Sequence, residues 1–113
     1  MAIRTIFFGT PAFALPSLRI LQEHPAIDLR GVVTRPDRPA GRGKALQPPP
    51  VKLLAHDLGL DLIQPETLKD PAIVEWLRQR SPDVVVVVAY GAFIPKAVRA
   101  VPPFGCVNLH PSR

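Results

Sequence analysis

Five consecutive valines, Val84–Val88, constrain the fold more than any other stretch of this 113-residue chain. Successive side chains of a β-strand point to opposite faces, so an apolar run without alternation must be covered on both faces. Such coverage is typical of a central strand in a parallel sheet that has helices on each side. The run therefore predicts an α/β fold.

The rest of the chain predicts alternating strands and helices. Apolar runs bounded by turn residues predict further strands at 3–8, 27–34, 60–63 and 104–110. Apolar periodicity, caps and prolines predict helices from Ala12 to Pro25, over 51–58 and over 70–80, with a short helical turn around 95–101. This order predicts one domain with a doubly wound, mainly parallel, Rossmann-like sheet.

Several classes of protein are disfavoured by what the chain contains. The turn after the first strand reads Gly9-Thr10-Pro11 rather than Gly-x-Gly-x-x-Gly, which disfavours a dinucleotide cofactor. Cys106 is the single cysteine and lies in an apolar strand, so we expect a buried, inert thiol. The longest apolar run, Val84–Tyr90, is far shorter than the ~20 residues that span a bilayer, and the N-terminus lacks a signal-peptide pattern. We therefore expect a cytoplasmic protein without a membrane segment.

The last predicted strand ends with an amide and an imidazole. Asn108 and His110 are two positions apart, so in a strand they project to the same face. A fixed amide donor beside a titratable ring suits a reaction that builds negative charge on an oxygen while a proton leaves. The alternative is an ordinary pair of polar residues at an exposed strand end.

A basic segment follows the second predicted strand, over residues 35–44. Glycine and proline recur in it and it has no hydrophobic period, so we expect no regular structure there. Its four basic residues and single acidic residue leave a net charge of +3, more than half of the chain's +5. These basic residues are Arg35, Arg38, Arg42 and Lys44. The segment suits contact with phosphates, although a solvated loop is the competing interpretation.

A weakly polar stretch follows the valine strand, at the edge where open α/β sheets bind ligands. It consists of Tyr90, Gly91, Ala92, Phe93 and Ile94. A pocket walled by these residues would accept a flat aromatic ligand, and plain hydrophobic packing is the alternative.

Taken together, the motifs resemble the N-terminal part of the methionyl-tRNA formyltransferase family, over essentially all 113 residues. The motifs are Phe8–Pro11, Phe13-Ala14, Arg35–Lys44, Pro50–Lys52, Gln64–Glu66, Val88–Gly91, Ile94-Pro95 and Gly105–His110. The Asn-x-His pattern is shared with other folate-dependent formyltransferases, whereas the basic segment 35–44 points to tRNA.

The resemblance implies transfer of a formyl group from 10-formyltetrahydrofolate to the α-amine of methionyl initiator tRNA. Asn108 would hold the formyl oxygen, and His110 would assist removal of a proton from the attacking amine. Residues 90–94 would contact the pterin, and the basic residues of 35–44 would contact the acceptor arm. The resemblance implies no metal, because the folate carries the one-carbon unit.

The chain also departs from the family pattern. In the family, Asn-x-His is followed by further strands, a catalytic aspartate and a C-terminal β-barrel domain, whereas this sequence ends at Arg113. We therefore expect residues 1–113 to be the N-terminal part of a catalytic domain, truncated before its last strands and without the barrel. We also expect an incomplete, inactive site and self-association through the exposed sheet edge.

Two alternative functions remain open. One is a folate-dependent formyltransferase with a small-molecule acceptor, which would not depend on Arg42 and Lys44. The other is a non-catalytic RNA-binding module, whose salt-sensitive binding would not depend on Asn108 or His110.

Overall fold

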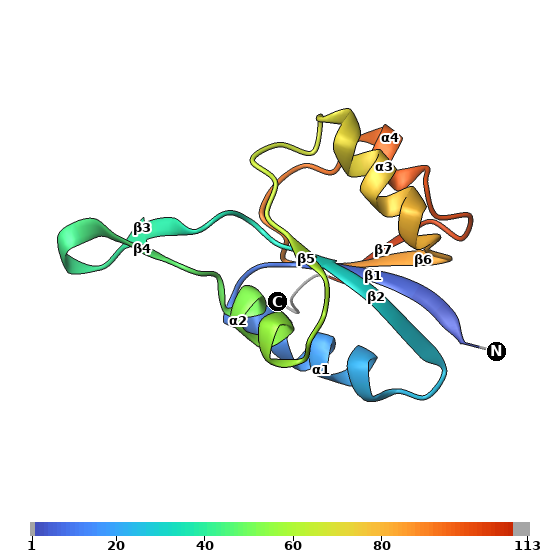
Figure 1. The fold of residues 1–113 in the computed structure, drawn as a ribbon, viewed down its shortest axis with the longest axis horizontal. Coiled ribbons are helices and arrows are strands. Elements are labelled where there is room, and N and C mark those ends of the chain that lie inside the picture. Colours follow the sequence, from blue (N-terminus) through green and yellow to red (C-terminus); the bar gives the residue numbers. More distant parts are fainter. Residues whose placement is uncertain (1, 110–113) are drawn as a thin grey trace.

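A five-stranded sheet forms the centre of the computed structural model, which describes residues 2–109 (Figure 1). The strands are β1 (Ile3–Gly9), β2 (Ile27–Val33), β5 (Leu62–Ile63), β6 (Val84–Val88) and β7 (Cys106–Leu109). Their order across the sheet is β5-β2-β1-β6-β7, and every neighbouring pair is parallel. The third predicted strand, expected over 60–63, is thus limited to two residues.

Helices cover both faces of this sheet. On one face lie α1 (Leu15–Glu23) and α2 (Pro50–Asp57), and on the other lie α3 (Pro71–Arg80) and α4 (Lys96–Arg99) (Figure 1). Each face has its own cluster of buried apolar side chains. The predicted doubly wound, parallel α/β fold is therefore confirmed.

Strand β6 shows why the valine run is informative. Val85 and Val87 belong to the cluster under α3 and α4, which also contains Leu77 and Val98. Val88 belongs to the opposite cluster, against which Val86 packs. The alternation of the strand therefore places valines in both cores.

The start of α3 is fixed by a capping side chain. The Asp70 carboxylate accepts a hydrogen bond from the backbone N–H of Ala72 at 2.9 Å, and Pro71 is the first residue of α3. This arrangement satisfies one of the backbone donors that a helix leaves free at its start. At the N-terminal helix, a single 3₁₀ turn over Ala12–Ala14 precedes α1, so the α-helix begins later than the predicted Ala12.

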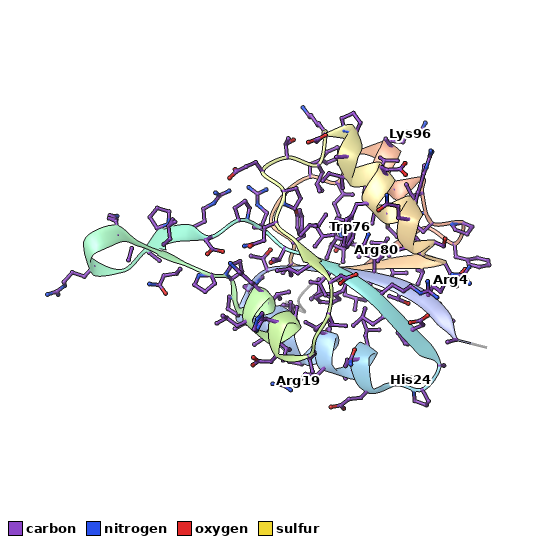
Figure 2. All side chains as sticks on the ribbon, viewed as in Figure 1. Arg4, Arg19, His24, Trp76, Arg80 and Lys96 are labelled. Carbon is purple, nitrogen blue, oxygen red and sulfur yellow. The ribbon has the colours of Figure 1, made fainter. Side chains whose placement is uncertain are left out.

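Trp76 is half-buried against the cluster under α3 rather than fully enclosed. The Arg80 guanidinium lies 3.9 Å from the centroid of its ring, and both side chains are labelled in Figure 2. One side of the Trp76 ring therefore packs on the core, and a cation covers part of the rest.

The prediction that residues 35–44 have no regular structure is wrong. The chain forms an antiparallel hairpin of β3 (Arg38–Ala40) and β4 (Ala45–Gln47), which projects away from the sheet (Figure 1). The reversal uses Gly41 and Gly43, whose φ angles are +71° and +84°. Glycine reaches such angles without a steric penalty, so glycines that suggest irregular structure here make a tight turn instead.

Candidate functional site

The carboxyl edge of the sheet brings together the turns that follow β1, β2 and β6. The Thr10 hydroxyl donates a hydrogen bond to the carbonyl of Tyr90 at 2.6 Å. The same hydroxyl accepts a hydrogen bond from the backbone N–H of Arg35 at 3.3 Å. One side chain therefore ties three turns together at the edge where parallel sheets bind ligands.

A cleft of about 530 Å³ opens at this edge. Its lining consists of Thr10, Pro11, Arg35, Arg38, Ala89, Tyr90 and Gly91. Two arginines thus line one hollow, and guanidinium binds phosphate and carboxylate oxygens in a fixed, two-pronged geometry. The cleft therefore suits a ligand that carries negative charge.

Tyr90 belongs to the core at the back of this cleft. Its side chain is buried and packs edge to face on Phe8, with ring centroids 5.3 Å apart. Burial raises the pKa of the Tyr90 phenol, and the nearby Arg35 guanidinium opposes part of that rise. Among residues 2–109 the buried hydroxyl has no hydrogen-bond partner. Its ring therefore acts as packing rather than as an open wall.

The other residues predicted to contact the pterin, 91–94, are more exposed than Tyr90. Gly91, Ala92 and Phe93 are exposed, and Phe93 is 77% exposed. Ile94 is half-buried and packs against the cluster under α3 and α4. This segment therefore presents one large aromatic ring and open backbone beside the cleft.

Asn108 lies on β7, the outermost strand at this end of the sheet. It pairs with Val87, and its side chain is exposed. By alternation it shares a face with Cys106, which packs against the cluster under α3 and α4. The predicted partner His110 lies outside the described residues, so the expected pairing of amide and ring stays a prediction.

The structure separates the predicted tRNA-contacting residues into two groups. Arg35 and Arg38 line the cleft, and the Arg38 guanidinium lies 3.9 Å from the Glu66 carboxylate. Arg42 and Lys44 are exposed on the turn that joins β3 to β4. The hairpin therefore carries positive charge at its tip, and the cleft carries it at the root.

Sequence reasoning missed a polar cluster at the root of the hairpin. The Asp37 carboxylate accepts hydrogen bonds from Gln64 Nε2 at 2.7 Å and from Lys52 Nζ at 3.1 and 3.2 Å. These hydrogen bonds, that from Gln64 first, lower the pKa of the Asp37 carboxyl from its usual value. Gln64 directly follows a short, half-buried strand, so its position at the carboxyl edge was the available signal.

Three further features of residues 2–109 are the state of the cysteine, the distribution of metal-binding residue types and the lengths of the helices. Cys106 is half-buried, and burial raises the pKa of its thiol, so the thiol is protonated at neutral pH. Residues 2–109 contain no cluster of three or more side chains of the metal-binding types His, Cys, Asp and Glu. In the same part of the chain, every helix is too short or too polar to cross a bilayer.

Comparison with known proteins gives a consistent result. A family model described as "Formyl transferase" matches residues 3–112. The chain is 51% identical to methionyl-tRNA formyltransferase of Syntrophus aciditrophicus (strain SB), over 97% of this chain and 35% of that protein. It is 51% identical to methionyl-tRNA formyltransferase of Frankia alni, over 96% of this chain and 33% of that protein. The chain thus spans about a third of the length of these curated relatives.

The fold also matches a solved structure. Phosphoribosylglycinamide formyltransferase from Streptococcus pneumoniae TIGR4 superimposes with a TM-score of 0.63 and 18% identity. The match covers 96% of this chain and 56% of that one. At this identity the match indicates a shared fold.

Proposed function

Because the chain belongs to the formyl transferase family, we propose that it supplies part of the active site of a methionyl-tRNA formyltransferase. The reaction moves a formyl group from 10-formyltetrahydrofolate to the α-amine of methionine on initiator tRNA. One observation carries the proposal: a single sheet edge joins an exposed strand amide, an arginine-lined cleft and the root of a basic hairpin. The names of relatives about half identical to this chain support it.

Asn108 is the proposed catalytic donor. When the amine attacks the formyl carbon, negative charge develops on the formyl oxygen, and the Asn108 side-chain N–H stabilises it. Loss of one such oriented donor typically lowers turnover roughly 10²–10³-fold. Its place on a strand paired to β6 limits the movement that would weaken this contact.

His110 is the proposed acceptor of the amine proton. As the bond between nitrogen and the formyl carbon forms, the amine nitrogen must lose a proton, and a neutral imidazole accepts it near neutral pH. The bond from the formyl carbon to the donor nitrogen then breaks, and that nitrogen takes a proton. The folate supplies the one-carbon unit, and no redox step is needed.

Residues 90–94 are the proposed contact for the pterin. The exposed ring of Phe93 offers an aromatic face, and Gly91 offers backbone without a side chain in the way. Tyr90, buried behind them, would support the segment through its packing on Phe8. The segment follows the central strand directly, so it is held close to the carboxyl edge.

The basic residues are proposed to bind the acceptor arm in two places. Arg42 and Lys44 at the hairpin tip would contact backbone phosphates, which position a nucleic acid without reading its sequence. Arg35 and Arg38 would contact the end of the arm where it enters the cleft. This division explains why the positive charge is spread from root to tip.

A chimera tests the proposal directly. In it, this chain replaces the matching segment of the Syntrophus aciditrophicus methionyl-tRNA formyltransferase, since the chain spans only 35% of that protein. We expect the chimera to formylate methionyl-tRNA, and we expect the 113-residue chain alone to show no turnover. Absence of turnover by the chimera would count against the proposed function.

Substitution of Asn108 then tests its role. Asn108→Ala in the chimera should lower kcat roughly 10²–10³-fold and change KM for tRNA little. Gln22→Ala, on the exposed part of α1, is the matched control and should leave kcat unchanged. A twofold or smaller effect of Asn108→Ala would exclude the proposed oxygen contact.

A further inference from the structure

The cluster of Asp37, Lys52 and Gln64 has no part in the proposed chemistry, yet it joins three segments that are distant in sequence. Asp37 directly precedes β3, Lys52 lies in the first turn of α2, and Gln64 directly follows β5. The sequence separations are 15 residues from Asp37 to Lys52 and 27 from Asp37 to Gln64. The hairpin therefore leaves the sheet between two elements that both hold its first residues.

The contacts engage both oxygens of the Asp37 carboxylate. Oδ1 accepts from Gln64 Nε2 at 2.7 Å and from Lys52 Nζ at 3.1 Å, and Oδ2 accepts from Lys52 Nζ at 3.2 Å. Gln64 Nε2 also donates to the carbonyl of Arg35 at 3.2 Å. One amide thus holds both the backbone and a side chain of the segment that leads into β3.

These contacts continue to the catalytic edge. The backbone N–H of Arg35 donates to Thr10, whose hydroxyl donates to the carbonyl of Tyr90, directly after β6. Strand β6 is in turn paired to β7, which carries Asn108. A continuous series of hydrogen bonds therefore links the root of the hairpin to the strands at the reacting edge.

Beyond its root, the hairpin has little else to fix its direction. Every residue from 38 to 47 is exposed, and Leu46, its largest apolar side chain, is 65% exposed. A small rotation at the root would therefore become a large displacement at Arg42 and Lys44, because the tip is far from its only support (Figure 1). Control of direction must come from the root.

We propose that Asp37, Lys52 and Gln64 form a clamp that fixes the direction of the hairpin and so positions Arg42 and Lys44 against the acceptor. These are positioning residues, since none of them touches the reacting atoms. The positioning role rests on the proposed function, whereas the clamp itself is a property of the chain alone.

A distance measurement tests the clamp without any substrate. Spin labels are placed at Leu46→Cys on β4 and Glu23→Cys at the end of α1, in a Cys106→Ser background, and pulsed electron paramagnetic resonance gives their distance distribution. The parent chain should give one narrow distribution. Asp37→Ala and Gln64→Ala should broaden it, and Asp57→Ala, which removes a carboxylate from the other end of α2, should not.

A double substitution shows whether the residues act as one unit. Asp37→Ala with Lys52→Met should broaden the distribution no more than Asp37→Ala alone, because each removes the same contact. Lys52→Arg, which keeps a cationic donor, should retain the narrow distribution. An unchanged distribution in both Asp37→Ala and Gln64→Ala would overturn the clamp, and circular dichroism spectra matching the parent establish that the variants are folded.

Kinetics of the chimera test the positioning role. Asp37→Ala should lower kcat/KM for methionyl-tRNA by up to roughly 10²-fold, mainly through KM, and Lys52→Arg should stay near the parent. A broadened distribution with unchanged KM would overturn the positioning role while the clamp stands. An inactive parent chimera would overturn the proposed function and the positioning role together, and the distance measurement would still decide the clamp.

Discussion

Strand β6 and the hairpin β3–β4 have opposite relations to their surroundings. In β6, Val85, Val87 and Val88 are almost completely buried, and both faces of the strand pack on helices. In the hairpin, every residue from 38 to 47 is exposed, and its two strands pair only with each other.

The difference shows that two kinds of constraint act on one short chain. Packing determines the residues of β6, because each side chain must fill a space between elements. Charge and turn geometry determine the residues of the hairpin, where cations alternate with glycines of positive φ. The two regions should therefore respond oppositely to the same kinds of substitution.

Introducing a charge should give the largest difference in unfolding free energy between β6 and the hairpin. Val87→Asp places a carboxylate at a position that is 4% exposed, and we expect it to cost at least about 4 kcal/mol of unfolding free energy. The matched Leu46→Asp, on the hairpin, should change it by less than about 0.5 kcal/mol. Urea unfolding measures both, and similar losses would contradict the proposed division.

Added side-chain volume should give the next largest difference. At Gly9 a Cβ would lie 2.9 Å from the carbonyl oxygen of Val88, so Gly9→Ala should cost roughly 1–3 kcal/mol. At Gly43 a Cβ meets nothing within 4 Å, and Gly43→Ala should cost about 1 kcal/mol through its φ of +84° alone.

Asparagine distinguishes these two causes. It tolerates positive φ but is larger than alanine, so Gly43→Asn should recover part of the loss whereas Gly9→Asn should deepen it. Thermal and urea unfolding of the four variants provide the comparison. Recovery at Gly9 would show that space is not the constraint there.

Removal of charge should affect the hairpin through binding and not through stability. The double variant Arg42→Ala, Lys44→Ala should bind an acceptor-arm RNA duplex with a weaker salt dependence. The slope of the logarithm of the binding constant against the logarithm of the salt concentration should fall in magnitude by about 0.7–0.9 per residue removed. The control removes two exposed cations elsewhere, Arg19 and Lys96, which lie on opposite faces of the sheet (Figure 2). Equal changes in the two variants would indicate that only net charge matters.

The smallest effect should be a dependence on pH at the hairpin root. The pKa of the Asp37 carboxyl is lower in the folded chain than its ordinary value of 3.8, so its hydrogen bonds stabilise the fold fully above that value. That contribution should be lost as pH falls through the folded pKa. The difference in unfolding free energy between parent and Asp37→Asn should therefore persist from pH 7 to about 4 and shrink below.

A second set of variants tests whether the hydrogen bonds from Lys52 and Gln64 cause this pH dependence. In a Lys52→Met, Gln64→Leu background, the carboxylate has lost both donors, so the pH dependence of the difference should disappear. Urea unfolding at several pH values measures it. An unchanged pH dependence would assign it to another group.

The sequence predicted the packed parts of the fold because their signals are local. Five adjacent valines were enough to show that both faces of β6 are covered. Two adjacent residues, Asp70 and Pro71, were enough to mark the start of α3. The hairpin was missed because glycine and proline indicate turns without showing that Arg38 would pair with Gln47. The clamp was missed because its members come from three separate elements, and only the fold brings them into contact.

The candidate site, like the fold, was predicted where the signal is local and missed where it depends on distant residues. The strand that carries Asn108 was predicted from its own residues, and the structure places it beside β6. The sequence left open whether Tyr90 lines a pocket or packs in the core, because its burial depends on Phe8 from the other end of the chain.

The pairing of β1 with both β2 and β6 has a consequence for synthesis on the ribosome. Gly9 pairs with Val88, and Arg4 forms an ion pair with Asp83 at 3.0 Å, so β1 can pair early with β2 but must wait for β6, which is made some eighty residues later. At translation rates of about 5–20 residues per second, this wait lasts roughly 4–16 s. During it, Ile6 and Phe8 lack the core contacts that Val85 and Val87 of β6 supply, so part of their apolar surface stays open to other hydrophobic surfaces.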